Sequence, residues 1–314
     1  MILEDFIVLT KAGLYCRYAD FYLDPKEPVK EAVISHAHAD HAVRGNTNVY
    51  CTRPTAVFME HRYKKNAAVR FNLLDHQSVF YIGEVAITFI PAGHMLGSAQ
   101  VLMIFKDVRY LYTGDYKIES DNSCEPFEFV KADVLITETT FADPLTRHPN
   151  AVNETLKLNG TRSNIMLGAY ALGKSQRMIG LITDHCPNKT ILVHHSIMPF
   201  IKIYEQFGKL TGNYQPYDRK IMKNNPNDHI YLVPPMVFNS YYRNVNLLKV
   251  FVTGWKYLQT QNDMQVYISD HADWEAILYT IDQVEPTEVW TLHGDGNALV
   301  SHFKNKLKVK ILNE

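Results

Sequence analysis

The stretch His36-Ala37-His38-Ala39-Asp40-His41 follows the segment 31–35, which has the composition of the end of a buried strand. It places four potential metal ligands within six consecutive positions. On an extended backbone, residues i and i+2 project to the same side, so His36 and His38 can bind one ion. Asp40 and His41, past the turn, can bind a neighbouring ion. Because imidazole and carboxylate donors suit zinc or a similar first-row metal, this spacing predicts a metalloenzyme rather than a polar loop with histidines placed by chance.

Length and composition limit the possible classes of protein. The chain has 314 residues, more than one compact core usually holds, so two lobes are expected. Hydrophobic residues make up 46% and charged residues 21%, as in a soluble globular protein. No apolar run reaches membrane-spanning length, and the first residues lack the zones of a signal peptide. The prediction is a protein without a membrane segment.

Cysteine spacing and net charge add two further constraints. The cysteines are scattered without paired spacing, which predicts reduced thiols and a cytoplasmic location. They are Cys16, Cys51, Cys124 and Cys186. The formal net charge is −1, so the chain lacks the global basic field that many nucleic-acid-binding proteins use. A polyanion would therefore have to be bound by local patches or by metal.

Two further candidate ligands come where predicted strands end. His94 follows the apolar segment 86–90, and Asp115 follows the segment 109–112. A glycine immediately before each of them permits a tight backbone turn. A single polar residue after a strand is often only a solvated surface residue. Together with the 36–41 motif, however, this pattern predicts that His94 and Asp115 converge on one rim of a sheet.

The order and spacing of these motifs resemble the metallo-beta-lactamase superfamily. The resemblance implies an α/β fold, the αββα metallo-beta-lactamase sandwich, with a two-metal site on one edge of the facing sheets. It also implies that Asp24, in Phe21-Tyr22-Leu23-Asp24-Pro25, supports the ligand shell. The implied ligands are His36, His38 and His94 for the first metal, Asp40 and His41 for the second, and Asp115 as a bridge between the two.

Three later segments resemble the signatures of the beta-CASP nucleases. They are 134–141 with Glu138, 267–274 with His271, and 290–296 with His293. Segments 169–178 and 251–255 resemble the beginning and end of the beta-CASP cap domain. The nearest likeness is to the bacterial ligase-associated DNA exonucleases, which are also described as mRNA 3′-end processing factor-like. The implied domains are 1–158 for the first part of the metallo-beta-lactamase domain, 159–262 for the cap, and 263–314 for the second part.

The resemblance gives these residues roles in phosphodiester hydrolysis. Two metals can share a hydroxide and stabilise charge on the phosphoryl group, with Asp40 and Asp115 as essential catalytic ligands. His271 is the candidate proton donor to the departing oxygen, and Glu138, if adjacent, would hold its ring and favour the protonated form. His293 would complete the second metal shell. The alternatives are a helix-capping role for His271 and a solvent-exposed strand end for His293.

Candidate substrate contacts lie in the predicted cap. Lys174 and Arg177 are basic residues there, and Ser240 and Thr253 are candidates for binding a terminal phosphate. The segment 168–175 also matches the nucleotide-binding pattern G-x-x-x-x-G-K-S. Its alternation of large and small residues instead favours an extended strand followed by a helix at 174–182, so we do not expect ATP binding.

The C-terminal part can be read from its periodicity. Residues 264–269 are predicted as a strand, 274–284 as a helix and 288–292 as a strand, a βαβ unit that would bring His271 and His293 to parallel strand ends. The segment 304–310 alternates lysines with small or apolar residues and is predicted as an edge strand.

The leading hypothesis is a two-zinc nuclease, with manganese as the alternative metal, that acts on DNA as a repair exonuclease. The second hypothesis is an RNA-processing nuclease. His293 resembles the RNA-cleaving branch, whereas the short cap and the segment Thr253-Gly254-Trp255 resemble the DNA branch. A catalytically silent scaffold and a thioester or lactam hydrolase are more remote alternatives. The family likeness also implies nucleic acid as the substrate and a ligase or helicase as a partner.

Overall fold

The computed structural model describes residues 1–314 apart from 210–211, 225–226, 241–246, 261, 305 and 313–314, and apart from the side chains of 222–224. The chain divides into two compact units. The first consists of Met1–Ser120, Cys124–Arg147 and His271–Glu314, and the second of Asp121–Ser123 and His148–Asp270. The domain boundaries given above stay a prediction.

The first unit contains a six-stranded mixed sheet with the strand order β1-β2-β3-β4-β5-β6. The strands are β1 (Ile7–Thr10), β2 (Gly13–Cys16), β3 (Phe21–Leu23), β4 (Glu31–Val33), β5 (Asn46–Thr52) and β6 (Ala68–Leu74). β1 to β3 are antiparallel neighbours, and β3 to β6 are parallel. Since parallel strands point the same way, the loops after β3 and β4 emerge at the same edge of this sheet.

A seven-stranded mixed sheet completes the strand content of this unit, with the order β18-β17-β11-β10-β9-β8-β7. Its strands are β7 (Val79–Ile82), β8 (Val85–Pro91), β9 (Ala99–Phe105), β10 (Val108–Tyr112), β11 (Val134–Glu138), β17 (Glu288–Leu292) and β18 (Lys308–Ile311). Every residue of β11 is buried, as expected for a central strand covered on both faces. β10, β11 and β17 run parallel, so their carboxyl ends meet at one edge.

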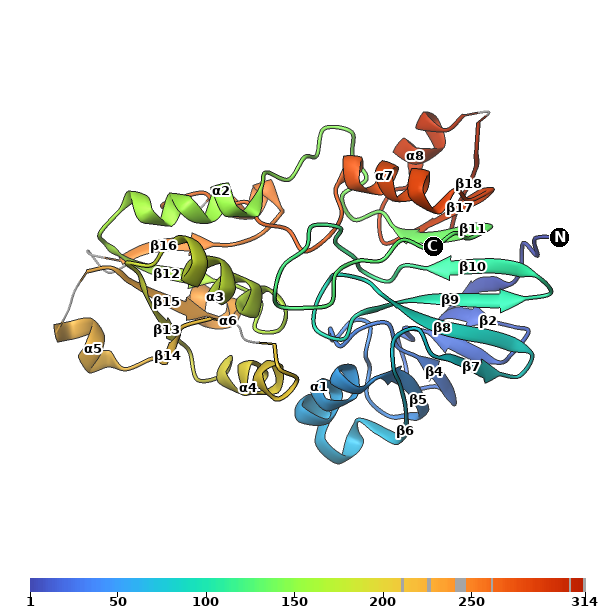
Figure 1. Cartoon of the computed structure of the whole chain (residues 1–314), viewed down its shortest axis with the longest axis horizontal. Helices are drawn as coiled ribbons and strands as arrows, with labels where there is room; N and C mark the ends of the chain where they lie inside the picture. The colour runs from blue at the N-terminus through green and yellow to red at the C-terminus, as the bar shows by residue number, and fades with distance from the viewer. Residues whose placement is uncertain (210–211, 225–226, 241–246, 261, 305, 313–314) are drawn as a thin grey trace. The chain divides into compact units, whose positions relative to one another are not determined.

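One apolar core lies between the two sheets and contains Phe21 and Leu23 of the first with Phe89, Val101 and Trp290 of the second. Helix α1 (Arg53–Tyr63) packs on the other face of the first sheet. Helices α7 (Trp274–Val284) and α8 (Asn297–His302) pack on the other face of the second (Figure 1). The prediction of a mixed α/β chain is confirmed.

The second unit is built on a five-stranded parallel sheet with the order β14-β13-β15-β12-β16. Its strands are β12 (Asn164–Gly168), β13 (Thr190–Val193), β14 (Gln215–Pro216), β15 (His229–Val233) and β16 (Leu247–Phe251). Its helices are α2 (Ala151–Leu156), α3 (Lys174–His185), α4 (Met198–Gln206), α5 (Arg219–Asn224) and α6 (Pro235–Ser240). Apolar clusters cover both faces, as a parallel sheet requires.

Several predicted elements are confirmed, among them the helix at 274–284 and the strand at 288–292. The edge strand predicted at 304–310 is present as β18, but it begins only at Lys308. The predicted strand at 264–269 is wrong. The backbone N–H groups of Val266 and Tyr267 donate to the side chains of Gln259 and Glu154, so this extended segment pairs with side chains rather than with a strand. His271 therefore does not lie at the end of a β-strand.

The extended strand predicted within the segment 168–175 is wrong, because residues 171–173 form a turn. β12 ends at Gly168, a turn follows, and α3 begins at Lys174 as predicted and continues to His185. The four cysteines are buried and form no disulfide with one another. Among the described residues, no helix has the length and apolar character needed to cross a bilayer.

Candidate metal centre

Residues 36–41, called here the histidine loop, follow β4, where the parallel strands of the first sheet end. His36 is fully buried, and its Nδ1 lies 2.9 Å from Ser35 Oγ. Arg62 of α1 donates to the carbonyl oxygen of Ala37, between the two histidines, over 2.7 Å. No local sequence pattern assigns Arg62 to this loop, because only the tertiary structure brings α1 beside it. Hydrogen bonds within the protein therefore hold His36 and Ala37 of this loop in place.

Three imidazole nitrogens converge at this loop. His36 Nε2 and His94 Nε2 each lie 3.1 Å from His38 Nδ1. Ring nitrogens bound to one tetrahedral zinc would be about 3.3 Å apart, given zinc–nitrogen bonds of about 2.0–2.1 Å. Burial lowers the pKa of His36 well below its usual value, with further lowering by His41, so its lone pair is available to a cation. The donor set thus fits a metal ion.

Glycine positions His94 after β8. Gly93 has φ +68°, and a Cβ there would lie 2.2 Å from the carbonyl oxygen of Lys117, so no other residue fits without displacing that backbone. The backbone N–H groups of His94 and Met95 both bond to Ser98 Oγ. The turn predicted from Gly93 is present, and it directs His94 toward His38.

Asp115 lies at the middle of the cluster, after β10. Its Oδ2 is 3.4 Å from His41 Nε2, 3.6 Å from His36 Nε2 and 3.9 Å from His94 Nε2. Burial alone would raise the pKa of Asp115, but His41, His271 and His36 together hold it well below its usual range. An ionised oxygen that faces imidazoles on both sides has the placement expected of a bridging ligand.

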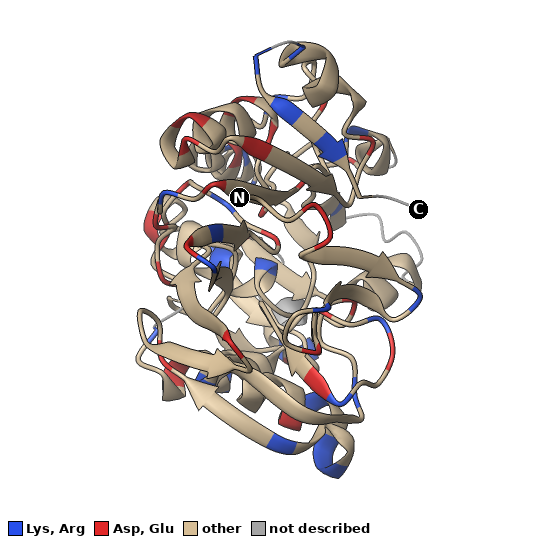
Figure 2. Cartoon of the chain, turned by 90° about the vertical axis from the view of Figure 1, so that its right-hand side faces the viewer, with Lys and Arg blue, Asp and Glu red and all other residues tan. Residues whose placement is uncertain are grey.

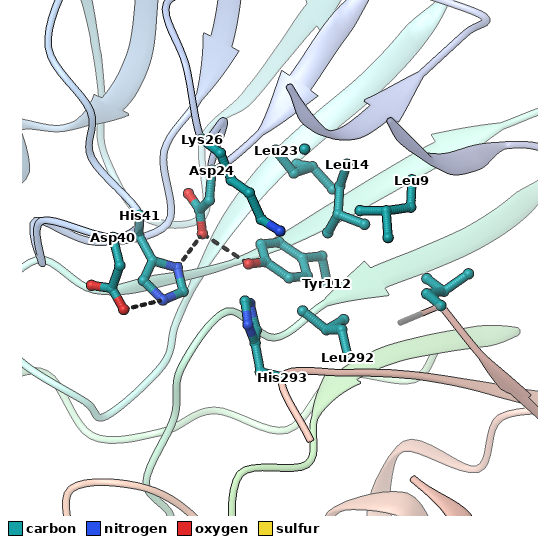
Figure 3. A pocket seen from close by; sticks show the side chains of 12 residues that line it. Leu9, Leu14, Leu23, Asp24, Lys26, Asp40, His41, Tyr112, Leu292 and His293 are labelled. Carbon is teal, nitrogen blue, oxygen red and sulfur yellow. Dashed lines mark hydrogen bonds and ion pairs between the residues drawn. The ribbon is translucent and has the colours of Figure 1, made fainter. Parts of the chain in front are cut away.

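Asp24 fixes the orientation of the His41 ring through a hydrogen bond to Nδ1. Its Oδ2 accepts hydrogen bonds from His41 Nδ1 at 2.9 Å and from the Tyr112 hydroxyl at 2.8 Å, while Oδ1 accepts from the backbone of Ser35 at 2.7 Å (Figure 3). Fixing Nδ1 leaves Nε2 of His41 directed at Asp115. Such outer partners set the tautomer and basicity of a ligating histidine. Asp24 therefore lies where the sequence resemblance predicted, in contact with a candidate ligand.

Asp40 and His293 are more exposed than the other candidate ligands. The Asp40 side chain is 80% exposed, with Oδ2 at 3.8 Å from His41 Nε2. The His293 ring lies 5.4 Å from the His41 ring, centre to centre. His293 has φ +55°, and Gly294 after it lies so close to Thr139 that a Cβ would come within 2.2 Å of that carbonyl oxygen. Both side chains line a pocket together with His41 (Figure 3).

Glu138 and His271 form a contact that spans 133 positions of the sequence. His271 Nδ1 is 2.9 Å from Oε2 and 3.1 Å from Oε1 of the fully buried Glu138. The same carboxylate accepts from the backbone of Tyr116 and from the Thr140 hydroxyl. His271 Nδ1 also lies 3.9 Å from Asp115 Oδ2. The two residues predicted to act together are thus adjacent and next to the ligand cluster.

The four predicted substrate contacts all lie in the second unit and have different surroundings. Lys174 and Arg177 are buried and paired with Asp270, at 3.0 Å and 2.8 Å. Such side chains favour a structural role over direct contact with substrate, so neither the predicted contact nor an ATP site finds support here. Thr253 is also buried, and its Oγ1 accepts from the backbone of Trp255. Ser240 is exposed at the end of α6.

The described residues contain three groups of side chains able to hold a metal ion. They are His36, His38, His94 and Asp115; Asp24, His36 and His41; and Asp115, Glu138 and His271. Within each group the ligand atoms lie within 4.8 Å of one another. All these residues belong to the first unit. The structure therefore supports a metal site at this edge of the two sheets.

Comparison with known proteins gives several relatives. The chain is 29% identical over 300 residues to a "Probable DNA ligase" of Opitutus terrae, an alignment that covers 90% of the chain and 28% of that protein. It is 28% identical over 148 residues to "Endoribonuclease ysh1" of Aspergillus fumigatus, covering 45% of the chain and 17% of the relative. It is 28% identical over 188 residues to an "RNase J-like protein" of Methanocaldococcus jannaschii, covering 50% and 44%.

A similar solved structure is that of a protein of unknown function from Enterococcus faecalis V583. The TM-score is 0.62 at 15% identity, with 90% of this chain and 79% of the other covered, so the likeness concerns the fold alone. No protein-family model matches the chain. The chain spans less than half the length of each relative named above. These relatives confirm the resemblance to the metallo-beta-lactamase superfamily and its beta-CASP proteins.

Proposed function

We propose that the protein is a metal-dependent hydrolase, a two-zinc phosphodiesterase nuclease, and most specifically a DNA exonuclease of repair that acts in the cytoplasm. One observation carries the proposal. Asp115 Oδ2 lies within 4 Å of ring nitrogens of His36, His41 and His94, and equally close to the His271 ring that Glu138 holds. A metal-ligand cluster and a candidate proton donor therefore share one carboxylate. The proposal includes an αββα metallo-beta-lactamase sandwich, with a beta-CASP cap at 159–262 between the parts 1–158 and 263–314.

The ligand assignment follows the family resemblance, and the clustering of His36, His38, His94 and Asp115 supports its first part. His36, His38 and His94 would hold one zinc, Asp40, His41 and His293 the other, and Asp115 would contact both. Two such ions supply a water molecule of lowered pKa and neutralise charge that develops on a phosphoryl group. Zinc is favoured by the imidazole-rich donor set, and manganese is the alternative.

Residues of the protein would transfer a proton to the departing sugar oxygen. Glu138 accepts a hydrogen bond from His271 Nδ1, which leaves Nε2 of the protonated ring to donate to the departing sugar oxygen. Because Glu138 also accepts hydrogen bonds from Tyr116 and Thr140, its position is fixed, and its carboxylate would favour the imidazolium form of His271. After donation, the neutral ring takes up another proton from water.

DNA and RNA are both candidate substrates. The likeness to a probable DNA ligase, which extends over 90% of the chain, favours DNA and a ligation-linked partner. An RNA-processing role is the second candidate, because two other relatives carry ribonuclease names. His293 beside the His41 ring fits that second reading, since it resembles the RNA-cleaving branch of the family.

One assay tests the function and separates the two candidates. Zinc-loaded protein is incubated with DNA and RNA single strands of the same sequence, labelled at either end, and the products are resolved by length. We expect stepwise shortening of the DNA from one end, with loss of all cleavage in Asp115→Ala. Faster degradation of the RNA would favour the second candidate. Inactivity on both polymers, together with inactivity on a simple phosphodiester, would refute the proposal.

A further inference from the structure

Four charged residues of the second unit form a buried cluster. In the view of Figure 2, acidic and basic residues are interspersed along the chain, and such side chains are rarely buried unless they are paired. Lys174, Arg177 and Asp270 are nevertheless only 5%, 4% and 7% exposed. The fourth member is Asp121, whose Oδ2 lies 3.2 Å from Arg177 Nε. With two cations and two carboxylates, the cluster is balanced in charge and lies largely out of solvent.

Asp270 joins the two cations of this cluster. Its Oδ2 lies 3.0 Å from Lys174 Nζ, and its Oδ1 accepts a hydrogen bond from Arg177 Nη1 at 2.8 Å. The same two side chains also donate to main-chain carbonyl oxygens just before Asp270. Lys174 donates to Ile268 over 2.7 Å, and Arg177 donates to Ser269 over 2.6 Å. Side chains of α3 thus hold three consecutive residues of the chain.

The residues before them are also held by side chains. The Tyr267 N–H donates to Glu154 Oε2 over 2.9 Å. The Gln259 amide bonds to both backbone groups of Val266, donating to the carbonyl oxygen over 2.6 Å and accepting from the N–H over 3.2 Å. The described residues 266–270 form no strand, so these side chains satisfy backbone groups that a β-ladder would otherwise satisfy.

This segment leads directly into His271, the candidate proton donor. Asp270 is the last residue of the second unit, and His271 begins the final part of the first unit. On the other side of His271, the Ala272 N–H donates to the carbonyl oxygen of Tyr116 over 2.9 Å. The chain is therefore held at both neighbours of His271, whose ring contacts Glu138. Because the backbone sets where a short side chain points, a shift at Asp270 would redirect the His271 ring.

We propose that Lys174 and Arg177 are positioning residues for His271 and that they act through Asp270. This inference rests on the proposed function and adds to it the contacts that align the proton donor. Proton transfer requires hydrogen-bond geometry, and a misplacement of about 1 Å can cost roughly 10²-fold in rate. A buried ion pair often adds little net stability, so fixing one arrangement of the chain is a reason to keep it. The two cations then need no contact with substrate.

The first test removes the charge of Asp270 and keeps its shape. The side chain of Asp270→Asn cannot accept from both Lys174 and Arg177, because one of its two oxygens is replaced by an NH₂ donor. The substrates are a single-stranded oligonucleotide and bis(p-nitrophenyl) phosphate, whose p-nitrophenolate departs without a proton. We expect kcat for the oligonucleotide to fall about 10-fold or more with an unchanged KM, and kcat for bis(p-nitrophenyl) phosphate to change little.

Asp228→Asn is the matched control. Asp228 also belongs to the second unit, and it also pairs with one lysine and one arginine, Lys189 at 2.8 Å and Arg162 at 3.4 Å. Asp228 directly precedes β15, at the amino end of the parallel sheet, whereas α3 begins beyond the carboxyl end of β12. We expect Asp228→Asn to keep both kcat values at the wild-type level.

Arg177→Lys is a second variant, measured in parallel in case Asp270→Asn folds poorly. Lysine keeps the charge but replaces the planar fork that reaches Ser269, Asp270 and Asp121 with a single ammonium group. We expect the same loss, confined to the oligonucleotide. Circular dichroism and elemental analysis check the fold and the metal content. Loss of the fold in both variants would show that the cluster supports the second unit rather than the ring, and would overturn the proposal.

The last test combines Asp270→Asn with His271→Ala. If the cluster acts through the ring, the double variant should cleave the oligonucleotide at the rate of His271→Ala alone. Losses that multiply, equal losses on both substrates, or an equal loss in Asp228→Asn would refute the positioning role. A raised KM with an unchanged kcat would also refute it and would indicate direct contact with substrate. A wild type that cleaves no oligonucleotide would instead mean that the proposed function has failed.

Discussion

The two halves of the metal centre are organised in different ways. In the inner half, formed by His36, His38 and His94, the ring nitrogens lie 3.1 Å apart, and His36 and His94 are almost fully buried. In the outer half, formed by His41, Asp40 and His293, the buried Asp24 holds His41. The Asp40 side chain is 80% exposed.

This difference shows which candidate ligands the protein holds in place through its own hydrogen bonds, without a bound metal. Buried hydrogen bonds to Ser35 and Ser98, and a partly buried one to the carbonyl oxygen of Ala37, fix the inner loops. An exposed carboxylate has no such constraint, so its position depends on what it binds. We therefore expect the inner half to bind metal with the higher affinity and the outer half to respond to substrate.

The largest effect should come from the residue that joins the halves. Asp115→Ala should abolish phosphodiester cleavage and lower the content of both metals, since Asp115 contacts ring nitrogens of both halves. Asp40→Ala should also abolish cleavage but lose mainly one metal. Elemental analysis after gel filtration measures the difference, with exposed Asp75→Ala as the control. Equal metal loss in Asp40→Ala and Asp115→Ala would contradict the division into two halves.

A smaller effect is expected for the proton donor, which is not a ligand of either half. His271→Ala should keep its metal and lower kcat by roughly 10²–10⁴-fold, the usual scale for a lost general acid. A p-nitrophenyl leaving group departs without a proton, so the same variant should be much less impaired on bis(p-nitrophenyl) phosphate. Equal losses on both substrates would indicate that His271 acts in another way.

Asp24→Asn tests the support of the outer half. The amide can accept from only one oxygen, so it cannot replace all the bonds to Ser35, His41 and Tyr112. We expect a roughly 10–100-fold loss of metal affinity, as for other outer partners of ligating histidines. The loss should fall on one of the two metals. Competition with a chromogenic chelator measures it, and a uniform loss for both metals would argue against a role confined to His41.

Arg62→Ala should give the smallest effect, on the inner half. It removes one partly buried bond to the carbonyl oxygen of Ala37 and should lower the free energy of unfolding by about 1 kcal/mol. Urea denaturation of the metal-free protein measures this change, with exposed Lys65→Ala as the control. A stability equal to that of the control would show that the loop does not depend on α1.

Four of the candidate ligands that the structure brings together could be predicted, because their placement depends on local geometry: His36, His38, His94 and Asp115. His36 and His38 share one side of an extended loop, and Gly93 and Gly114 make the turns that present His94 and Asp115. Backbone conformation over a few residues decides these features. For the same reason the helix at 274–284, with an Asp273 cap and regular apolar spacing, was predicted correctly.

Contacts between distant segments could not be predicted in this way. Nothing local indicates that Lys174 and Arg177 are buried against Asp270, so their assignment to substrate is not supported by their surroundings. The strand predicted at 264–269 does not form, because the side chains of Gln259 and Glu154 accept hydrogen bonds from its backbone N–H groups. The positions of those two side chains are set by the tertiary structure.

The sequence by itself determined the kind of chemistry, since the number, type and local spacing of the histidines and carboxylates are properties of short segments. Only the tertiary structure decided which of them meet. Glu138 and His271 come together because the packing of the second sheet and α7 closes a loop of 133 positions. Such contacts depend on how the whole chain packs, and no local spacing encodes them.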